Sequence, residues 1–299
     1  MLEITLCGIP FKNPLIAASG VFGFGAEYGE LYDVSIWGGL CTKGLTLQPK
    51  SGNSGYRIYE TASGVMNSIG LQNPGVEAFV NTELPRMKKL NTRIIANLGG
   101  HSTDDYLLGI EKLDRSDVDM IELNISCPNV KSGGMAFGLQ AKTAGEIVGL
   151  CRERCHKPFI VKLSPNAENI VDVALACENA GADALSLVNT FQAMAIDVKK
   201  RKPVFENIYA GLSGAAIKPL ALRMVHAVCQ KVSIPVIGIG GIRTAEDVIE
   251  FMMAGATAVQ IGAALFSNPL LPIQMIDGLQ QIVEQEKISD LSEIRGIIK

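Results

Sequence analysis

The sequence lacks long apolar runs and any strong excess of one charge. No run approaches the about 20 apolar residues of a membrane-spanning helix, and residues 1–11 lack the basic segment and apolar stretch of a secretory signal. Lys and Arg total 27 against 30 Asp and Glu, a net charge of −3. Because the two charges are nearly balanced, the composition gives no reason to expect a nucleic acid or a membrane as partner.

Cysteine is sparse and irregularly spaced. An odd count of seven argues against a disulfide framework and favours a reducing cytoplasm. No Cys-x-x-Cys pair is present, Cys151 and Cys155 being the nearest two, so an iron–sulfur cluster held by this chain alone is not expected. A Gly-x-Gly-x-x-Gly motif after a strand is also missing, so the sequence does not support a Rossmann site for NAD. The three histidines have no metal-ligand spacing, and the cysteines other than Cys127 are predicted to be packing residues.

Short apolar runs alternate with helical segments along the whole chain. Most of the runs are fully apolar, as parallel strands buried on both faces are. Eight stand out: Pro14–Ala18, Gly39–Thr42, Arg93–Leu98, Val118–Leu123, Phe159–Leu163, Ala182–Val188, Pro235–Ile239 and Ala258–Ile261. Eight such units favour an α/β fold, a (β/α)8 TIM barrel formed by residues 1–299 as one domain. A doubly wound open sheet is the alternative.

Two predicted helices have clear ends. The pattern Ala167–Ala180 stops at Gly181, and Thr244–Ala254 begins with a Thr N-cap and stops at Gly255.

Three long segments are predicted to be loop insertions over the carboxyl-terminal mouth of the barrel, and such loops are usually functional or contain local strands. They are residues 48–64, 128–138 and 191–211, the last with the basic run Lys199–Lys202, which we interpret as solvated surface.

Polar residues replace apolar ones at nearly every predicted strand end, where barrel enzymes carry their chemistry. Turns account for Gly, Ser and Asn in general, but not for two Lys and three Asn at one mouth: Lys43, Lys162, Asn97, Asn124 and Asn189. Their convergence predicts a ligand site. After the last two strands, Gly240-Gly241 and Gly262-Ala263 are typical of phosphate-binding loops, because glycine lets backbone N–H groups approach an anion.

The most informative segment is residues 124–134, Asn-Ile-Ser-Cys-Pro-Asn-Val-Lys-Ser-Gly-Gly. The amide of Asn124 both donates and accepts hydrogen bonds. The thiol of Cys127 can hold or release a proton near neutral pH if its surroundings lower a pKa of about 8.5. Such a pair suits a planar polar ring that must be held while a proton leaves it. A buried structural cysteine beside a turn is the alternative.

This segment, together with Met66–Gly75, Gly211–Gly214 and Ile239–Ile242, resembles the class 1 dihydroorotate dehydrogenases over nearly the whole chain. The closest likeness is to the catalytic subunit of the NAD-linked, heterotetrameric 1B subgroup. The membrane-bound class has Ser in place of the Cys and a long N-terminal extension, for which a first strand near residue 14 leaves no room. Ala263 departs from the Thr that relatives often carry.

The resemblance implies oxidation of (S)-dihydroorotate to orotate in de novo pyrimidine synthesis, with FMN at the mouth and no metal. Cys127 matches the base that takes the C5 proton while FMN takes the C6 hydride, and Lys162 would stabilise negative charge near flavin N1. Positions that match flavin contacts are Ser19, Lys43, Gly44, Asn97, Asn124, Lys162, Val188, Gly214, Gly240, Gly241, Gly262 and Ala263. Positions that match substrate contacts are Lys43, Asn67, Ser68, Ile69, Gly70, Leu71, Asn124, Asn189 and Thr190.

The resemblance also implies a partner subunit that carries FAD and a [2Fe–2S] cluster and passes electrons to NAD. Two catalytic chains would form a dimer within a cytoplasmic heterotetramer, with no nucleic acid or membrane partner. Three alternatives stay open. They are a fumarate-linked dihydroorotate dehydrogenase, a flavin-dependent dihydropyrimidine dehydrogenase that acts on uracil or thymine, and a non-catalytic barrel that binds a phosphorylated ligand.

Overall fold

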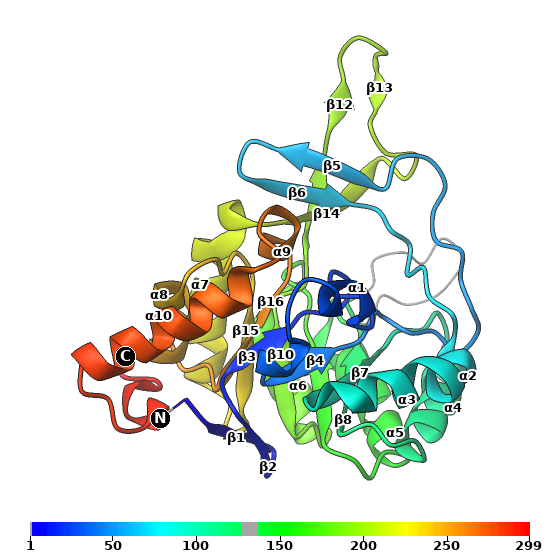
Figure 1. The fold of residues 1–299 in the computed structure, drawn as a ribbon. Coiled ribbons are helices and arrows are strands. Elements are labelled where there is room, and N and C mark those ends of the chain that lie inside the picture. The colour runs from blue at the N-terminus through cyan, green and yellow to red at the C-terminus, as the bar shows by residue number, and fades with distance from the viewer. Residues whose placement is uncertain (1, 127–136) are drawn as a thin grey trace.

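The computed structural model describes residues 2–126 and 137–299 (Figure 1). Its centre is a closed barrel of parallel strands in chain order, in which β16 pairs back with β3 at Gln260 and Ile16. The strands are β3 (Leu15–Ala17), β4 (Gly39–Cys41), β7 (Arg93–Leu98), β8 (Met120–Asn124), β9 (Phe159–Lys162), β10 (Ala184–Leu187), β15 (Val236–Ile239) and β16 (Ala258–Ile261). The predicted strands and barrel are confirmed, and the open sheet is excluded.

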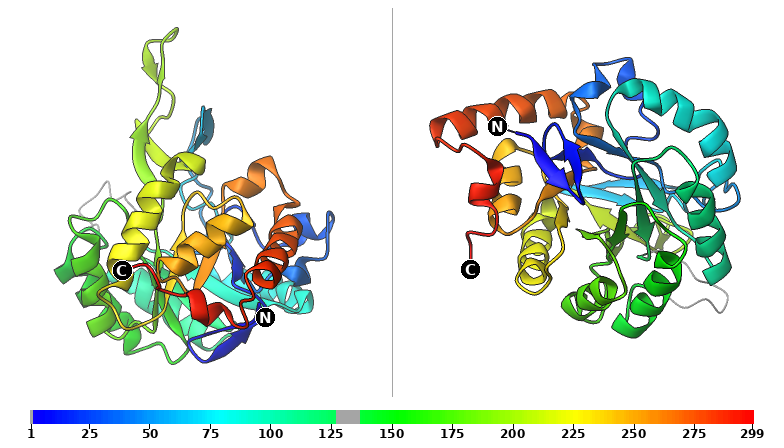
Figure 2. Two further views of the ribbon diagram at one scale, coloured as in Figure 1. Left: turned by 90° about the vertical axis from the view of Figure 1, so that its left-hand side faces the viewer. Right: turned by 90° about the horizontal axis from the view of Figure 1, so that it is seen from below.

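Helices surround the barrel (Figure 2). The longer ones are α4 (Thr103–Asp114), α5 (Ala141–Arg152), α6 (Ile170–Asn179), α7 (Lys218–Cys229), α8 (Ala245–Met253) and α10 (Leu271–Gln285). Short helical segments are α1 (Ala26–Gly29), η1 (Val34–Ile36), α2 (Val76–Ala78), η2 (Phe79–Glu83), α3 (Leu84–Met87), η3 (Lys88–Leu90), η4 (Ala215–Ile217), α9 (Ala264–Ser267) and η5 (Leu291–Ile294). Among the described residues, no helix combines the length and the apolar character needed to cross a membrane.

The two predicted helix starts have different outcomes. Helix α8 follows the predicted N-cap Thr244, whose hydroxyl accepts from Asp247 N while the Asp247 carboxylate accepts from the Thr244 backbone. Helix α6 begins at Ile170 rather than at Ala167, so that predicted boundary is wrong. The physical reason is Asn169, whose side chain accepts from the Val171 N–H and so caps the helix later than the apolar pattern suggests.

The barrel interior is apolar at its amino-terminal end. Ile95, Met120 and Ile160 pack there against Leu6 and Phe11. Leu6 and Phe11 belong to a hairpin of β1 (Ile4–Leu6) and β2 (Ile9–Phe11), which lies across the base of the barrel in the view from below in Figure 2. A second, larger apolar layer fills the space between the barrel and its helices. Because the hairpin closes this end, the opposite end is left for ligands.

A separate antiparallel sheet lies above the carboxyl ends of the barrel strands (Figure 1). Its order is β11 (Phe191–Met194), β14 (Tyr209–Ser213), β6 (Gly64–Asn67) and β5 (Ile58–Thr61), over a small core of Met66, Phe205 and Ala210. The insertions predicted at 48–64 and 191–211 therefore have strands of their own, which meet in one sheet. The insertion predicted at 128–138 lies largely outside the described residues.

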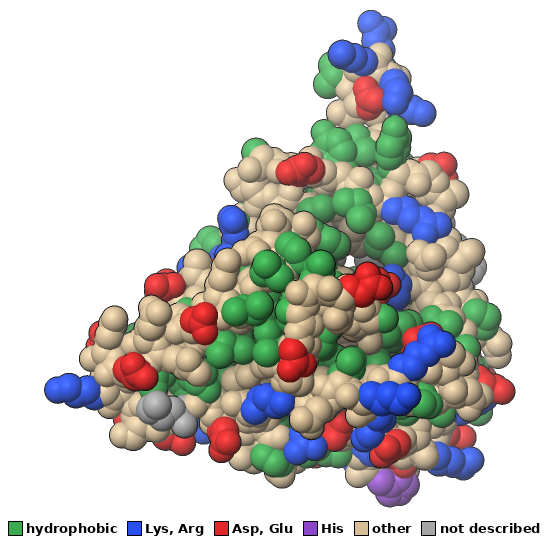
Figure 3. All heavy atoms as spheres, in the orientation of Figure 1, with side chains coloured by type: hydrophobic (Ala, Val, Ile, Leu, Met, Phe, Trp, Pro, Cys, Tyr) green, Lys and Arg blue, Asp and Glu red, His purple; other side chains and the backbone are tan. Residues whose placement is uncertain are grey.

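A narrow ribbon of β12 (Ile196–Asp197) and β13 (Lys202–Pro203) projects from this sheet. The basic run Lys199–Lys202 lies at its tip and is exposed, as a solvated surface should be. Lys200 pairs with Asp197 at 3.3 Å and lies 5.8 Å from the ring centre of Tyr56. Figure 3 shows Lys and Arg side chains gathered at this tip, above a band of hydrophobic side chains.

Candidate active site at the barrel mouth

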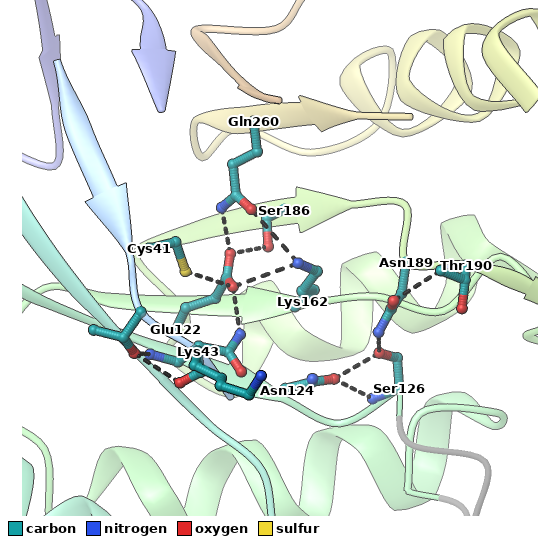
Figure 4. Close-up of polar contacts among 12 residues, drawn as sticks. Cys41, Lys43, Glu122, Asn124, Ser126, Lys162, Ser186, Asn189, Thr190 and Gln260 are labelled. Carbon is teal, nitrogen blue, oxygen red and sulfur yellow. Dashed lines mark hydrogen bonds and ion pairs between the residues drawn. The ribbon is translucent and has the colours of Figure 1, made fainter. Parts of the chain in front are cut away.

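Polar side chains from six barrel strands meet in one buried layer below the mouth (Figure 4). Glu122 of β8 lies at its centre and is fully buried. Its Oε1 accepts hydrogen bonds from Ser186 at 2.8 Å and Gln260 at 2.6 Å. Its Oε2 accepts from Asn97 at 2.6 Å and from the Cys41 thiol at 3.2 Å. We call these residues, with Lys162, the Glu122 network.

Lys162 of β9 supplies the positive charge of this network. Its Nζ lies 3.7 Å from Glu122 Oε2 and 3.5 Å from Gln260 Oε1, and its side chain is 6% exposed. Burial alone would raise the pKa of Glu122. The charge of Lys162 and the hydrogen bonds from Ser186, Gln260 and Asn97 outweigh burial and lower that pKa below its ordinary value. Glu122 therefore remains a charged carboxylate although it is out of contact with water.

Cys41 packs in the lower core, as predicted, but it also donates its thiol hydrogen to Glu122. Burial and the neighbouring carboxylate raise the pKa of Cys41 well above its ordinary value. The thiol therefore stays protonated and acts as a donor. The predicted packing role is confirmed, and the hydrogen bond to the carboxylate beside it is an additional role that the sequence did not indicate.

A second polar cluster joins the ends of β8 and β10. Asn124 Oδ1 accepts from the Ser126 hydroxyl at 2.6 Å and from its backbone N–H at 3.2 Å. Asn189 donates its amide to the same hydroxyl, and its Oδ1 accepts from the Thr190 N–H at 2.8 Å. The hydroxyl of Tyr106 holds the Asn124 carbonyl at 2.8 Å. Three predicted substrate residues are thereby brought together, and Cys127, which follows Ser126, lies outside the described residues.

The wall next to β4 is formed around Gly44. A methyl group on Gly44 would lie 3.1 Å from Asn97 Oδ1, 3.1 Å from Leu71 and 3.9 Å from the Ser19 hydroxyl. This close approach brings a predicted substrate residue, Leu71, against three predicted flavin residues. Lys43, which precedes Gly44, is half-buried at the mouth (Figure 4), and its backbone N–H donates to the Gly23 carbonyl.

The inserted sheet positions the predicted substrate segment Asn67–Leu71. Asn67 ends β6 and donates to the Gly211 carbonyl at 3.4 Å. Ser68 accepts from the amide of Asn53 at 3.0 Å, and Gly70 and Leu71 take left-handed backbone angles, with φ of 74° and 54°. These constraints turn the segment from the sheet down towards Gly44 and the mouth.

Glycine allows close packing at the exit of β15. The φ angles of Gly240 and Gly241 are 129° and 75°, and added Cβ atoms would lie 2.7 Å from Ala221 and from Lys218 respectively. Ala221 and Lys218 belong to α7, so its first turns lie against this loop. Gly214, with φ of 101°, meets the backbone of Gly64 in the same way. The predicted phosphate loop is thus fitted closely to its surroundings.

The other predicted flavin positions lie on the neighbouring strand ends. Val188 is buried and lies 3.6 Å from the position of a Cβ added to Gly240, and a Cβ added to Gly262 would lie 3.4 Å from Ala18. Ala263 precedes the short helix α9. A pocket opens beside Gly241, lined by Ala215, Lys218, Pro219, Gly241, Arg243, Thr244 and Asp247.

Sequence reasoning missed Glu122, Ser186 and Gln260. A signal was available, because alternate residues of a strand face the same way. Glu122 comes two residues before the predicted ligand Asn124, within a run that was treated as apolar. Ser186 and Gln260 likewise come two residues before Val188 and Gly262. Among the described residues, no group of three or more His, Cys, Asp or Glu side chains is arranged to hold a metal.

Comparisons with known proteins point to one family. The family model for dihydroorotate dehydrogenase matches residues 1–283. Three similar proteins carry the name dihydroorotate dehydrogenase B (NAD(+)), catalytic subunit. The protein from Petrotoga mobilis is 57% identical over 296 residues, covering 99% of both chains. That from Caldicellulosiruptor bescii is 50% identical over 297 residues, with the same coverage. That from Geotalea uraniireducens is 50% identical over 298 residues, covering 99% of this chain and 98% of its own.

Proposed function

Because the chain belongs to the dihydroorotate dehydrogenase family, we propose that it oxidises (S)-dihydroorotate to orotate in pyrimidine synthesis, as the catalytic subunit of an NAD-linked enzyme. The observation that carries this proposal is the ionised pair of Lys162 and Glu122 at the base of a mouth lined by amides. A fixed cation shielded from water suits a reaction that delivers negative charge to a ring above it.

The mouth fits FMN in two respects. Asn97 Oδ1 is buried and has no hydrogen-bond partner among the described residues, although buried polar atoms nearly always have one. A ligand N–H, such as that of a flavin ring, would satisfy it. An added Cβ at Gly44, Gly240 or Gly241 would lie 3.1 Å or less from other protein atoms, so these strand ends keep the bare backbone that an anion or ring can approach closely. The residues that would hold FMN are the twelve that match flavin contacts, from Ser19 to Ala263.

The reaction removes a proton from C5 and a hydride from C6 of dihydroorotate, which leaves the double bond of orotate. FMN, when bound, accepts the hydride. Cys127, as a thiolate, takes the proton, so that atoms and electrons balance. Asn67–Leu71, Asn124, Asn189 and Thr190 hold the ring, and Lys43 pairs with the substrate carboxylate. Lys162 stabilises the negative charge that reduction brings.

The proposal extends to the assembly. Residues 1–299 form one FMN-binding domain, and two chains form a dimer. Each chain passes electrons to a partner subunit with FAD and a [2Fe–2S] cluster, which reduces NAD. We place this heterotetramer in the cytoplasm, because the odd number of cysteines suits a reducing compartment and the six described ones are free.

Anaerobic mixing of the purified chain with dihydroorotate tests the activity. We expect a yellow protein whose visible flavin absorbance is lost after mixing with dihydroorotate. With dihydrouracil, which lacks the carboxylate that pairs with Lys43, we expect little loss of this absorbance. A colourless protein that binds no added FMN would overturn the proposal. Equal reduction by dihydrouracil would instead indicate a dihydropyrimidine dehydrogenase.

A further inference from the structure

Glu122 is surrounded by donors on all sides, although it matches none of the family contacts named above. An ionised carboxylate can only accept hydrogen bonds. Cys41, Asn97, Ser186 and Gln260 each donate to it, and Lys162 lies within ion-pair distance. These five residues come from five different strands. A carboxylate that accepts this many hydrogen bonds is held in one position, and it in turn restricts the orientation of the side chains that donate to it.

The first consequence concerns the amides of Asn97 and Gln260. Because the carboxylate only accepts, each amide must turn its NH2 group towards Glu122, at 2.6 Å in both cases. Their oxygens then face elsewhere. Gln260 Oε1 lies 3.5 Å from Lys162 Nζ, and Asn97 Oδ1 is left without a partner among the described residues, beside Gly44. The carboxylate thereby orients the Asn97 amide so that its Oδ1 is available as an acceptor at the mouth.

The second consequence concerns the charge of Lys162. Burial favours the neutral form of a lysine, and an adjacent negative charge favours the protonated form. The titratable groups that face Lys162 are Glu122 on β8 and the neutral thiol of Cys41 on β4, and Lys43 follows β4 at the mouth. Its remaining partner, Gln260, carries no charge. Glu122 is therefore the only anion against Lys162 among the described residues.

We propose that Glu122 is a positioning residue, which keeps Lys162 protonated in both redox states of the cofactor and orients Asn97 so that its Oδ1 accepts from the cofactor ring. This inference rests on the proposed function, since the ligand is taken to be FMN. Glu122 acts through Lys162 and Asn97 and does not itself contact the substrate.

The number of protons taken up on reduction reports this role directly. If Lys162 is already protonated, the two electrons are accompanied by one proton. The equilibrium constant for reduction then changes tenfold per pH unit, which corresponds to a shift of about 30 mV in the midpoint potential. In Glu122→Gln, a neutral Lys162 gains a proton when the ring becomes anionic. Two protons then accompany the two electrons. The equilibrium constant for reduction changes a hundredfold per pH unit, and the midpoint potential shifts by about 60 mV per pH unit. A merely structural role would not change this slope.

The experiment is a spectroelectrochemical titration of the full chain with FMN between pH 7 and 9. All variants carry Cys127→Ser, so that a thiol with an ordinary pKa of about 8.5 does not titrate in the same range. Glu122→Asp keeps the charge and is expected to keep the one-proton slope. Ser186→Ala removes one hydrogen bond from the same carboxylate but leaves its charge, and is the matched control with an unchanged slope.

Affinity for oxidised FMN gives an independent measurement. Glu122→Gln also frees the Asn97 amide to turn, and we expect the Kd for FMN to rise about tenfold, the equivalent of losing one hydrogen bond. Ser186→Ala is expected to change it less than about threefold. An unchanged slope and Kd in Glu122→Gln, or a two-proton slope in the wild-type Glu122 background, would overturn the inference.

A variant that does not fold is also informative. If Glu122→Gln is unfolded while Glu122→Gln with Lys162→Met folds, the loss comes from an uncompensated Lys162 charge, which supports the inference. If both are unfolded, Glu122 is needed for folding independently of the Lys162 charge, and the inference is overturned. A chain with Cys127 intact that binds no FMN, or is not reduced by dihydroorotate, contradicts the proposed function instead.

Discussion

At the residue scale, the pair of Lys162 and Glu122 places a positive charge where water does not reach. A buried ion pair is poor evidence for a contribution to stability, because removing two charges from water costs several kcal/mol per ion before their attraction repays it. The four hydrogen bonds to Glu122 offset part of this cost. What the pair provides is a cation held still beneath the mouth.

The base is tested by Cys127→Ser. We expect the variant to retain FMN but to be reduced by dihydroorotate about 10²–10⁴-fold more slowly near neutral pH, because a serine hydroxyl is a much weaker proton acceptor and a positioned base has an effect of this size. Stopped-flow absorbance at pH 7 measures the rate. Cys229→Ser, which changes a half-buried thiol on α7, controls for the loss of a cysteine and should match wild type. Equal rates in both variants would show that Cys127 is not the base.

The residues at strand ends were predicted, whereas those two positions earlier on the same strands were missed. Lys162 and Asn124 are polar residues just after or at the end of apolar runs, and this contrast is visible in the sequence. Glu122 makes sense only beside a cation and four donors, which come from other strands of the closed barrel. Strand alternation could have placed Glu122 on the same face as Asn124, but the donors that make a buried carboxylate possible there are a property of the fold.

At the element scale, the barrel strands were predictable because parallel strands with both faces buried are almost wholly apolar. The inserted sheet was not. Its central pairing joins β6 to β14, with Asn67 opposite Gly211, and these residues are far apart in the chain. Strands that face solvent have less apolar patterns, and their register depends on a partner that local sequence does not identify.

The start of α8 is tested by Thr244→Ala. The Thr244 hydroxyl accepts from the Asp247 N–H, and losing an N-cap of this type lowers the free energy of unfolding by about 1 kcal/mol. Thr244→Ser keeps the hydroxyl and should remain close to wild type. Urea denaturation measures both variants. If serine were as destabilising as alanine, the hydrogen bond would not be the cause.

The stability of the contact between the end of α4 and the loop before β9 should depend on pH, because Asp114 holds the two together. Its carboxylate accepts from the backbone N–H groups of His156 and Lys157 and from His156 Nδ1. Burial alone would raise the pKa of Asp114, but these hydrogen bonds lower it below the ordinary value of 3.8. A lowered pKa means that the charged form stabilises the fold above about pH 4, and that this contribution is lost as the pH falls through the folded-state value.

The measurement is the unfolding free energy of wild type and Asp114→Asn from pH 7 to pH 2. Asn keeps an acceptor for one of the backbone N–H groups but carries no charge. We expect wild type to be more stable by about 1–2 kcal/mol above pH 4, with the difference shrinking as the pH falls below 3.8. A difference that stayed constant, or grew with acid, would contradict the assignment.

At the scale of the whole molecule, the barrel is closed at one end and open at the other. The β1–β2 hairpin buries Leu6 and Phe11 in the amino-terminal end, and the inserted sheet stands over the carboxyl-terminal end. Substrate and cofactor would therefore enter from one side, between that sheet and the strand ends. Electrons that arrive in the barrel would have to leave through the protein to an acceptor outside it.

The route of those electrons is the last prediction. The sequence has neither a Rossmann fingerprint for NAD nor a Cys-x-x-Cys pair for a cluster. We expect the isolated chain with FMN to reduce artificial dyes with dihydroorotate but to reduce NAD poorly. Addition of a flavin and iron–sulfur partner subunit should restore NAD reduction, which is followed at the absorbance of NADH.

Two controls separate the possible acceptors. The partner subunit alone, mixed with dihydroorotate and NAD, should be inactive, because it lacks the Lys162 and Asn124 site. Fumarate added to the isolated chain tests the competing, fumarate-linked arrangement. Fast fumarate reduction would favour that arrangement. Efficient NAD reduction by the isolated chain with no iron present would falsify the two-subunit route, since the electrons would then need no second protein.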